Sequence, residues 1–330
     1  MSDALLKVEN LETAFATPRG LLRAVDNVSF ELPRGRTLGV VGESGSGKSV
    51  LSRTIMGLLP SNARIGDHSK VLFDGHDMRN LNEKALRRIR GKDVAMVFQD
   101  PMTSLNPTLT IGRQIGEVLT HHLDMRGSAA RERSVELLRA VGIPQPDTRV
   151  DQYPHQLSGG MRQRVVIAIA LSCEPKLLIA DEPTTALDVT VQAEILDLLR
   201  RQQRERNMAM ILITHDLGVV AGRADEVAVM YAGRIVERAP TRELFHNMRM
   251  PYTQALLQSI PRIDDGIHTR LTAIPGRPPD LIQPPDGCPF APRCRYTEGR
   301  CESEKPSLEQ MTDADHAYAC WKPLQTGAAA

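Results

Sequence analysis

The hydrophobic pattern of the chain predicts buried strands that alternate with helices. Val28, Phe30 and Leu32 alternate with polar residues, as in a strand with one buried face. Residues 38–41 are apolar and run directly into a glycine-rich turn, which predicts a strand, a loop and then a helix. The other expected elements are buried strands at 176–181, 209–216 and 226–231 and a helix over 191–203. Strands that alternate with helices indicate an α/β fold with a parallel sheet covered by helices.

Two regions depart from this alternation. From Pro107 to about Tyr153 the pattern is helical: Ile111, Ile115, Val118 and Leu119 share one face, and 131–142 forms a second amphipathic helix. Beyond about residue 260, ten of the 22 prolines fall in the last 70 residues, so that tail cannot easily build a core of its own. We therefore expect a main domain over 1–260, with a helical subdomain at about 107–160, and an extension over 261–330.

The composition limits the classes of partner. The 41 Lys and Arg residues balance 40 Asp and Glu, so no global field attracts nucleic acid or an anionic membrane, and no nucleic-acid partner is expected. The start of the chain has neither a basic nor an apolar run, and the longest wholly apolar stretch, 165–171, is too short to cross a bilayer. The sequence predicts a soluble, cytoplasmic protein, in which cysteines are read as metal ligands before disulfides.

Residues 42–49, GESGSGKS, fit the pattern G-x-x-x-x-G-K-[ST] and lie between a predicted strand and a predicted helix. The backbone amides of such a loop surround phosphate, and the helix N-terminus adds its positive dipole end. Lys48 would reach the β and γ phosphates of a nucleotide, and Ser49 would bind magnesium. The alternative is a glycine-rich turn with an exposed lysine, which this context disfavours. The predicted nucleotide contacts are Gly42, Ser44, Gly45, Ser46, Gly47, Lys48 and Ser49.

Two further stretches fit the same chemistry. Asp181 and Glu182 end an apolar strand, where one carboxylate can hold the water shell of magnesium and the other can polarise an attacking water. Two solvated acids at the start of a turn are the alternative. Residues 157–161, LSGGM, present Ser158, Gly159 and Gly160 at the start of a helix, as a second phosphate cradle. One chain does not need two cradles for one ATP.

These motifs occur in an order that resembles the ATP-binding subunits of ABC transporters: the phosphate loop at 42–49, LSGGM, the acidic pair, TALD at 185–188 and His215 after ILIT. The resemblance implies an ATPase whose P-loop parallel sheet carries an antiparallel β subdomain, a helical subdomain and a loop-rich C-terminal extension. It also implies a second subunit, because the LSGGM stretch of one chain, the family's signature motif, closes over the ATP held by the other chain.

The resemblance assigns roles to single residues. Glu182 resembles the general base, His215 the histidine that hydrogen-bonds the γ phosphate, and Asp188 the contact across the dimer. Gln99 resembles the residue that touches magnesium and the attacking water, so Ser49, Gln99 and Asp181 are the expected magnesium ligands. Phe15 matches the aromatic residue that stacks on adenine, with an ordinary core phenylalanine as the alternative.

Three further stretches indicate which group of ABC transporters the chain resembles. QDPMTSLNP at 99–107, YPHQLSGGMRQRV at 153–165 and PGRPPDL with GCPFAPRC in the tail resemble the oligopeptide and dipeptide importers. The resemblance implies a heterodimer with a second homologous ATPase, two transmembrane permease subunits, an extracytoplasmic binding protein, and a peripheral place on the cytoplasmic face of the inner membrane. Nickel or glutathione import remains an alternative. So does an ATPase that remodels complexes without transport, although Gln99 and Leu157 are too close for a long coiled-coil arm.

Four of the five cysteines lie in the tail with the spacing C-x5-C-x6-C-x18-C: Cys288, Cys294, Cys301 and Cys320. This spacing is neither the short C-x2-C of structural zinc nor a compact ferredoxin run, so zinc, an iron–sulfur cluster and unliganded thiols all remain open. The resemblance to the peptide importers implies a 4Fe-4S cluster, which we expect to pin the tail without taking part in hydrolysis.

Overall fold

The computed structural model describes residues 4–185, 187–260, 273–310 and 315–325. The chain forms two compact units. We call residues 1–5, 33–36 and 80–211 the helical unit, and residues 6–32, 37–79 and 212–330 the sheet unit. Within the described ranges, every helix is too short or too polar to span a bilayer.

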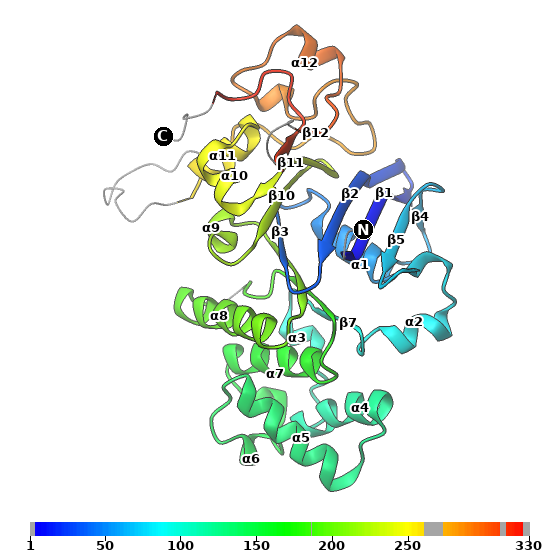
Figure 1. Cartoon of the computed structure of the whole chain (residues 1–330), viewed down its shortest axis with the longest axis vertical. Coiled ribbons are helices and arrows are strands. Elements are labelled where there is room, and N and C mark those ends of the chain that lie inside the picture. The colour runs from blue at the N-terminus through cyan, green and yellow to red at the C-terminus, as the bar shows by residue number, and fades with distance from the viewer. Residues whose placement is uncertain (1–3, 186, 261–272, 311–314, 326–330) are drawn as a thin grey trace. The chain divides into compact units, whose positions relative to one another are not determined.

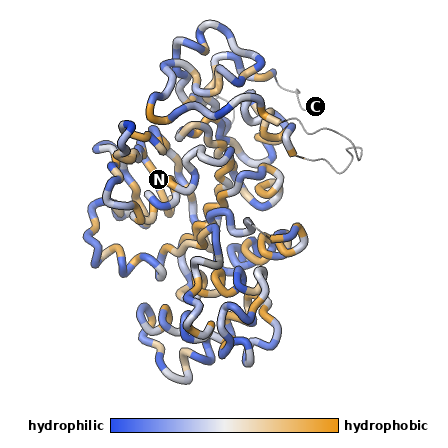
Figure 2. Tube along the Cα trace, turned by 180° about the vertical axis from the view of Figure 1, so that it is seen from behind, coloured by the Kyte–Doolittle hydropathy of each residue, from blue (hydrophilic) through white to orange (hydrophobic). Residues whose placement is uncertain are grey.

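The helical unit contains the amphipathic helices that the sequence predicts. α4 (Ile111–Leu123), α5 (Gly127–Ala140) and α7 (Gly159–Leu171) pack against one another (Figure 1). Ile111, Ile115 and Leu119 are fully buried, because their spacing places them on one face of α4. In Figure 2 apolar and polar stretches alternate in the helical part of the chain. The unit also has α2 (Glu83–Ile89), α3 (Pro101–Ser104), α6 (Pro146–Arg149), the 3-10 turn η2 (Pro154–Gln156) and α8 (Val189–Glu205).

Two parallel strands of the helical unit end at predicted site residues. β7 (Val94–Val97) pairs with β8 (Leu177–Asp181), with Val97 opposite Ala180. Both strands are buried along their whole length, which explains their continuous apolar sequence. Since parallel strands share their carboxyl ends, Gln99 and Glu182 both follow this edge.

The sheet unit begins with an antiparallel sheet. Its order is β2 (Gly20–Pro33), β1 (Ala4–Thr17), β5 (Lys70–Phe73) and β6 (His76–Asp77), and β4 (Ala63–Ile65) pairs with the far end of β1. Val28, Phe30 and Leu32 are buried, as their alternation predicts. This sheet corresponds to the antiparallel β subdomain that the family resemblance implies.

The second group of strands in this unit includes β3, the strand that leads into the phosphate loop. β3 (Thr37–Val41) pairs in parallel with β10 (Glu226–Tyr231), and β11 (Arg234–Pro240) is antiparallel to β10. β9 (Ala209–Thr214) begins in the helical unit and ends in the sheet unit. The remaining elements before the tail are α1 (Lys48–Ile55), the 3-10 turn η1 (Met78–Asn80), α9 (Leu217–Val220), α10 (Thr241–Asn247) and α11 (Pro251–Gln258).

The described part of the tail belongs to the sheet unit and extends its strands. β13 (Ala317–Tyr318) joins β11 antiparallel, with Tyr318 opposite Glu237, and β12 (Glu309–Gln310) pairs with β13. The only helices among the described tail residues are the turn η3 (Ala291–Arg293) and α12 (Gly299–Ser303). The domain boundary expected after residue 260 falls next to residues 261–272, which lie outside the described ranges.

Candidate nucleotide site and cysteine pocket

The predicted phosphate loop lies between β3 and α1, as the sequence motif requires. Gly42 has no room for a side chain, because a Cβ there would lie 2.1 Å from the carbonyl oxygen of Met230. Gly47 has a φ of +101°, and a Cβ would lie 2.2 Å from the carbonyl oxygen of Ala24. These two glycines are therefore required by close backbone approach and by the left-handed conformation.

Lys48 begins α1 and is buried. Its ammonium group donates to the carbonyl oxygens of Gly42 at 2.7 Å and Glu43 at 3.0 Å, so it lies inside the loop. The alternative reading of an exposed lysine in a glycine-rich turn is wrong. A buried cation at a helix N-terminus is a suitable partner for phosphate oxygens.

Glu182 follows β8 and takes an unusual backbone conformation, with a φ of +47°. The left-handed region costs a non-glycine residue about 1–3 kcal/mol when the surrounding structure imposes it, and such residues cluster at functional sites. Its carboxylate accepts hydrogen bonds from the Gln99 side-chain amide at 3.3 Å and from the Thr185 hydroxyl at 3.1 Å. The helical unit therefore brings together the predicted base and Gln99, and adds Thr185.

The signature and the residue predicted to cross the dimer act as helix caps. Ser158 accepts from the backbone N–H of Met161 at 3.3 Å at the start of α7, and Asp188 accepts from that of Val191 at 2.9 Å at the start of α8. Val191 also packs on the signature, since a Cβ on Gly160 would lie 2.8 Å from it. Ser158, Gly159 and Gly160 thus stand at a helix N-terminus, where anions bind.

The last two predicted nucleotide contacts lie in the sheet unit. Phe15 is on β1 opposite Ala63 and is half-buried, which leaves part of its ring accessible. His215 directly follows β9 and is exposed. The predicted nucleotide-site residues thus divide between the two units. The sheet unit contains residues 15, 42–49 and 215. The helical unit contains residues 99, 158–160, 181, 182 and 188.

No metal centre is formed by the described side chains alone. Among those residues, no group of three or more His, Cys, Asp or Glu side chains is arranged to hold a metal ion. For magnesium this is the usual case, because the ion keeps several waters and binds substrate phosphates with only one or two carboxylates. The Ser49 hydroxyl and the buried Asp181 carboxylate are oxygen donors of the kind that magnesium takes.

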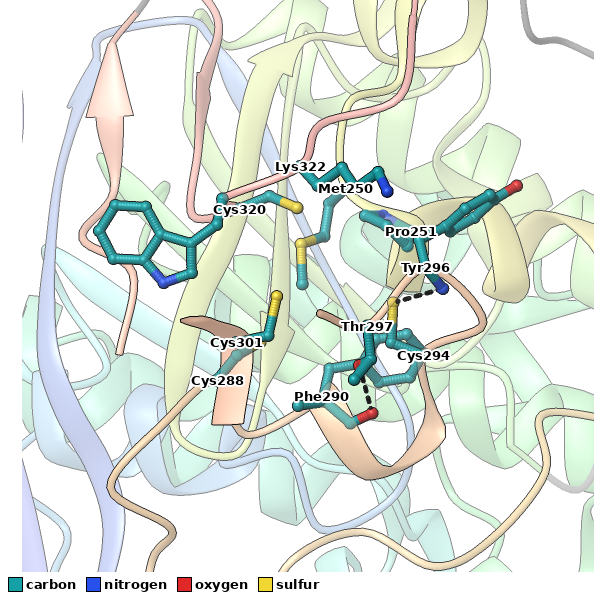
Figure 3. A pocket seen from close by; sticks show the side chains of 12 residues that line it. Met250, Pro251, Cys288, Phe290, Cys294, Tyr296, Thr297, Cys301, Cys320 and Lys322 are labelled. Carbon is teal, nitrogen blue, oxygen red and sulfur yellow. Dashed lines mark hydrogen bonds between the residues drawn. The ribbon is translucent and has the colours of Figure 1, made fainter. Parts of the chain in front are cut away.

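The four tail cysteines do come together. Cys288, Cys294, Cys301 and Cys320 line one small cavity of about 20 Å³, with Met250 from the chain before the tail (Figure 3). All four are free thiols. The cavity is close to the size of one water molecule. Four thiols are a suitable donor set for a metal centre. Among the described residues they are not arranged as a ligand group, so the 4Fe-4S prediction is not supported.

Burial controls the chemistry of these thiols. It raises the pKa of Cys288 and of Cys294, and it raises the pKa of Cys320 to about 12. The thiolate is the metal ligand and the nucleophile. Burial therefore favours the neutral thiol form of Cys288, Cys294 and Cys320, and a metal would have to displace the protons of these three on binding.

Two neighbours of the phosphate loop and one neighbour of Glu182 were not predicted as site residues. Tyr252 on α11 accepts a hydrogen bond from the Glu43 amide at 2.9 Å, and Arg293 in the tail forms an ion pair with the Glu43 carboxylate. Thr185 could have been recognised, because a hydroxyl three residues after Glu182 can fold back on it. No local pattern identifies Tyr252 or Arg293 as neighbours of the loop.

Comparison with known proteins gives the family. Residues 25–185 match the family described as ABC transporter, and residues 236–301 match that described as oligopeptide/dipeptide transporter, C-terminal region. The chain is 52% identical to the dipeptide transport ATP-binding protein DppD of Bacillus subtilis, over 97% of this chain and 95% of that protein. It is 51% identical to the oligopeptide transport ATP-binding protein OppD of Escherichia coli, over 98% and 95% of the two chains.

A solved structure supports the fold. The ATP-binding cassette MJ0796, in a dimeric post-hydrolysis state bound to ADP and Pi, is similar with a TM-score of 0.65 and 28% identity. The match covers 72% of this chain and 99% of that one. The predicted fold class and family are thereby confirmed. The chain belongs to the ABC transporter family, as an ATP-binding subunit that also carries the C-terminal region of the oligopeptide and dipeptide transporters.

Proposed function

We propose that this chain hydrolyses ATP to power the import of oligopeptides or dipeptides through a membrane transporter. The observation that carries the proposal is the phosphate loop, with Lys48 buried in it at the head of α1. The substrate class rests on the two relatives, which are named for oligopeptide and dipeptide transport and match nearly the whole chain.

Each predicted residue has a role in this reaction. Residues 42–49 bind the phosphates, with magnesium held by Ser49, Gln99 and Asp181. Glu182 takes a proton from water while the water oxygen forms a bond to the γ phosphorus, and the bond to the ADP oxygen breaks. His215 donates to the γ phosphate. Phe15 stacks on adenine, and Ser158, Gly159, Gly160 and Asp188 contact the ATP site of the partner subunit.

The proposed assembly has four kinds of component. A second homologous ATPase pairs with this chain as a heterodimer, and two permease subunits and an extracytoplasmic binding protein complete the transporter. The chain acts at the cytoplasmic face of the membrane, with 1–260 as the ATPase domain and 261–330 as the extension.

Purification from detergent-solubilised membranes of the native host tests this function. We expect the tagged chain to recover a second ATPase and two permeases, and its deletion to abolish uptake of labelled dipeptides or oligopeptides. The control is uptake of free amino acids, which should not change. Loss of nickel or glutathione uptake with intact peptide uptake would mean that the transported substrate is nickel or glutathione and not a peptide. Recovery only as a soluble ATPase stimulated by nucleic acid would contradict transport.

The second part of the proposal is a structural metal centre at the tail cysteines, either a 4Fe-4S cluster or zinc. Its support is the cavity that the four tail cysteines share, because the thiolate of cysteine is a ligand for zinc and for iron–sulfur clusters. We expect protein purified without oxygen to contain about four irons per chain and broad visible absorbance. If the protein contains about one zinc per chain instead, the metal centre is supported and its metal is zinc. No metal, with all five cysteines of the chain alkylated after unfolding, would contradict it.

A further inference from the structure

The tail reaches the phosphate loop through one side chain. Arg293 ends the turn η3, and its guanidinium nitrogens lie 2.6 Å and 2.9 Å from the two carboxylate oxygens of Glu43. The pair is bidentate, and the Arg293 side chain is only 3% exposed. Bidentate pairs of this kind combine strength with a fixed geometry.

The Arg293 guanidinium also forms other hydrogen bonds and contacts two aromatic rings. It donates to the carbonyl oxygen of Pro275 at 2.8 Å and to the Tyr231 hydroxyl at 3.2 Å. The rings of Tyr231 and Phe290 lie at 5.8 Å and 5.9 Å from its central carbon. The charge is thus held on several sides, so its position over Glu43 is imposed by the packing of the tail.

Glu43 is the second residue of the phosphate loop. Its amide, its carbonyl oxygen and its carboxylate all form hydrogen bonds. Its carbonyl oxygen accepts from the Lys48 ammonium at 3.0 Å and from the Ser46 amide at 3.2 Å. Its own amide donates to the Tyr252 hydroxyl at 2.9 Å. A shift of Glu43 would therefore move both the lysine and an amide that are assigned to the phosphates.

One turn of backbone connects Arg293 to the cysteine pocket. The amide of Ala291 donates to the carbonyl oxygen of Cys288 at 3.0 Å, and the amide of Cys294 donates to that of Ala291 at 3.2 Å. Both cysteines line the pocket. The turn that ends at Arg293 therefore shares its backbone hydrogen bonds with two cysteines of the pocket.

We infer that Arg293 is a positioning residue for ATP binding, which fixes the phosphate loop through Glu43 and couples the order of the cysteine pocket to the nucleotide. The inference rests on the proposed role of residues 42–49 in binding ATP. It gives the tail a part in the nucleotide site, whereas the sequence predicts only a pinned extension.

Conservative variants of the full chain test the positioning role. Arg293→Lys keeps the charge and loses the bidentate geometry, and Glu43→Gln keeps the shape and loses the charge. We expect each to weaken ATP binding by about 10- to 100-fold, the range for lost hydrogen bonds to a charged group. The double variant should be no weaker than the weaker single variant, since the two residues act as a pair. In the transporter, KM for ATP should rise more than kcat falls.

The matched control is Arg295→Lys, because Arg295 lies in the same tail but donates to Gln254 at 2.9 Å and not to the loop. Its ATP affinity should equal that of the wild type. Unchanged affinity in folded Arg293→Lys or Glu43→Gln would overturn the inference, as would an equal loss in Arg295→Lys. Wild-type ATP affinity in a folded Lys48→Ala variant would instead contradict the proposed function itself.

Coupling to the pocket has its own test. Cys294→Ala removes a pocket thiol next to Arg293, and we expect it to weaken ATP binding in the wild-type background but not in the Glu43→Gln background. An equal loss of affinity in both backgrounds would show that the pocket does not act through this ion pair.

Discussion

Glu182→Gln is expected to lower the rate of ATP hydrolysis by at least about 100-fold, the lower end of the range for removal of a general base. The amide oxygen of glutamine can still accept from Gln99 and Thr185, which donate to the Glu182 carboxylate at 3.3 Å and 3.1 Å. The site therefore keeps its shape and loses only the group that takes the proton. The measurement is phosphate release at saturating ATP, together with ATP affinity, which should remain within about threefold of the wild type.

Glu132→Gln on the exposed face of α5 is the matched control for this substitution. It makes the same chemical change in the same unit and should leave turnover unaffected. Normal turnover in Glu182→Gln would remove Glu182 as the base. A loss of affinity as large as the loss of turnover would mean that the carboxylate acts in ATP binding and not as the base.

Lys48→Ala is expected to weaken ATP binding by about 10- to 100-fold, because hydrogen bonds to a charged group contribute about 1.5–3 kcal/mol each. The ammonium group lies inside the loop, 2.7 Å from the Gly42 carbonyl oxygen, so the substitution removes the cation that the loop itself holds. Isothermal titration with a non-hydrolysable ATP analogue measures the change directly.

The control for Lys48 is Lys84→Ala on α2, which removes the same side chain from an exposed position. Its affinity should match the wild type, and the thermal midpoint of both variants should be compared to exclude unfolding. Wild-type affinity in a folded Lys48→Ala variant would mean that residues 42–49 do not bind the phosphates.

The sequence alone determined the elements whose pattern is local. The apolar runs at 38–41 and 176–181 become β3 and β8, and the spacing of Ile111, Ile115 and Leu119 becomes the buried face of α4. The same holds for the chemistry of the phosphate loop, since its glycines and Lys48 lie within eight consecutive residues. These features depend on neighbours a few residues apart, so they can be read before the chain is folded.

Tertiary structure alone decided how the tail relates to the loop. Arg293 and Glu43 are 250 residues apart in the chain, and no period or motif connects them. The gathering of Cys288, Cys294, Cys301 and Cys320 around one cavity, and the raised pKa of the Cys320 thiol, likewise depend on how the tail packs around them. Burial and long-range ion pairs arise from the packing of the whole chain, whereas the sequence specifies only which groups are available to be packed.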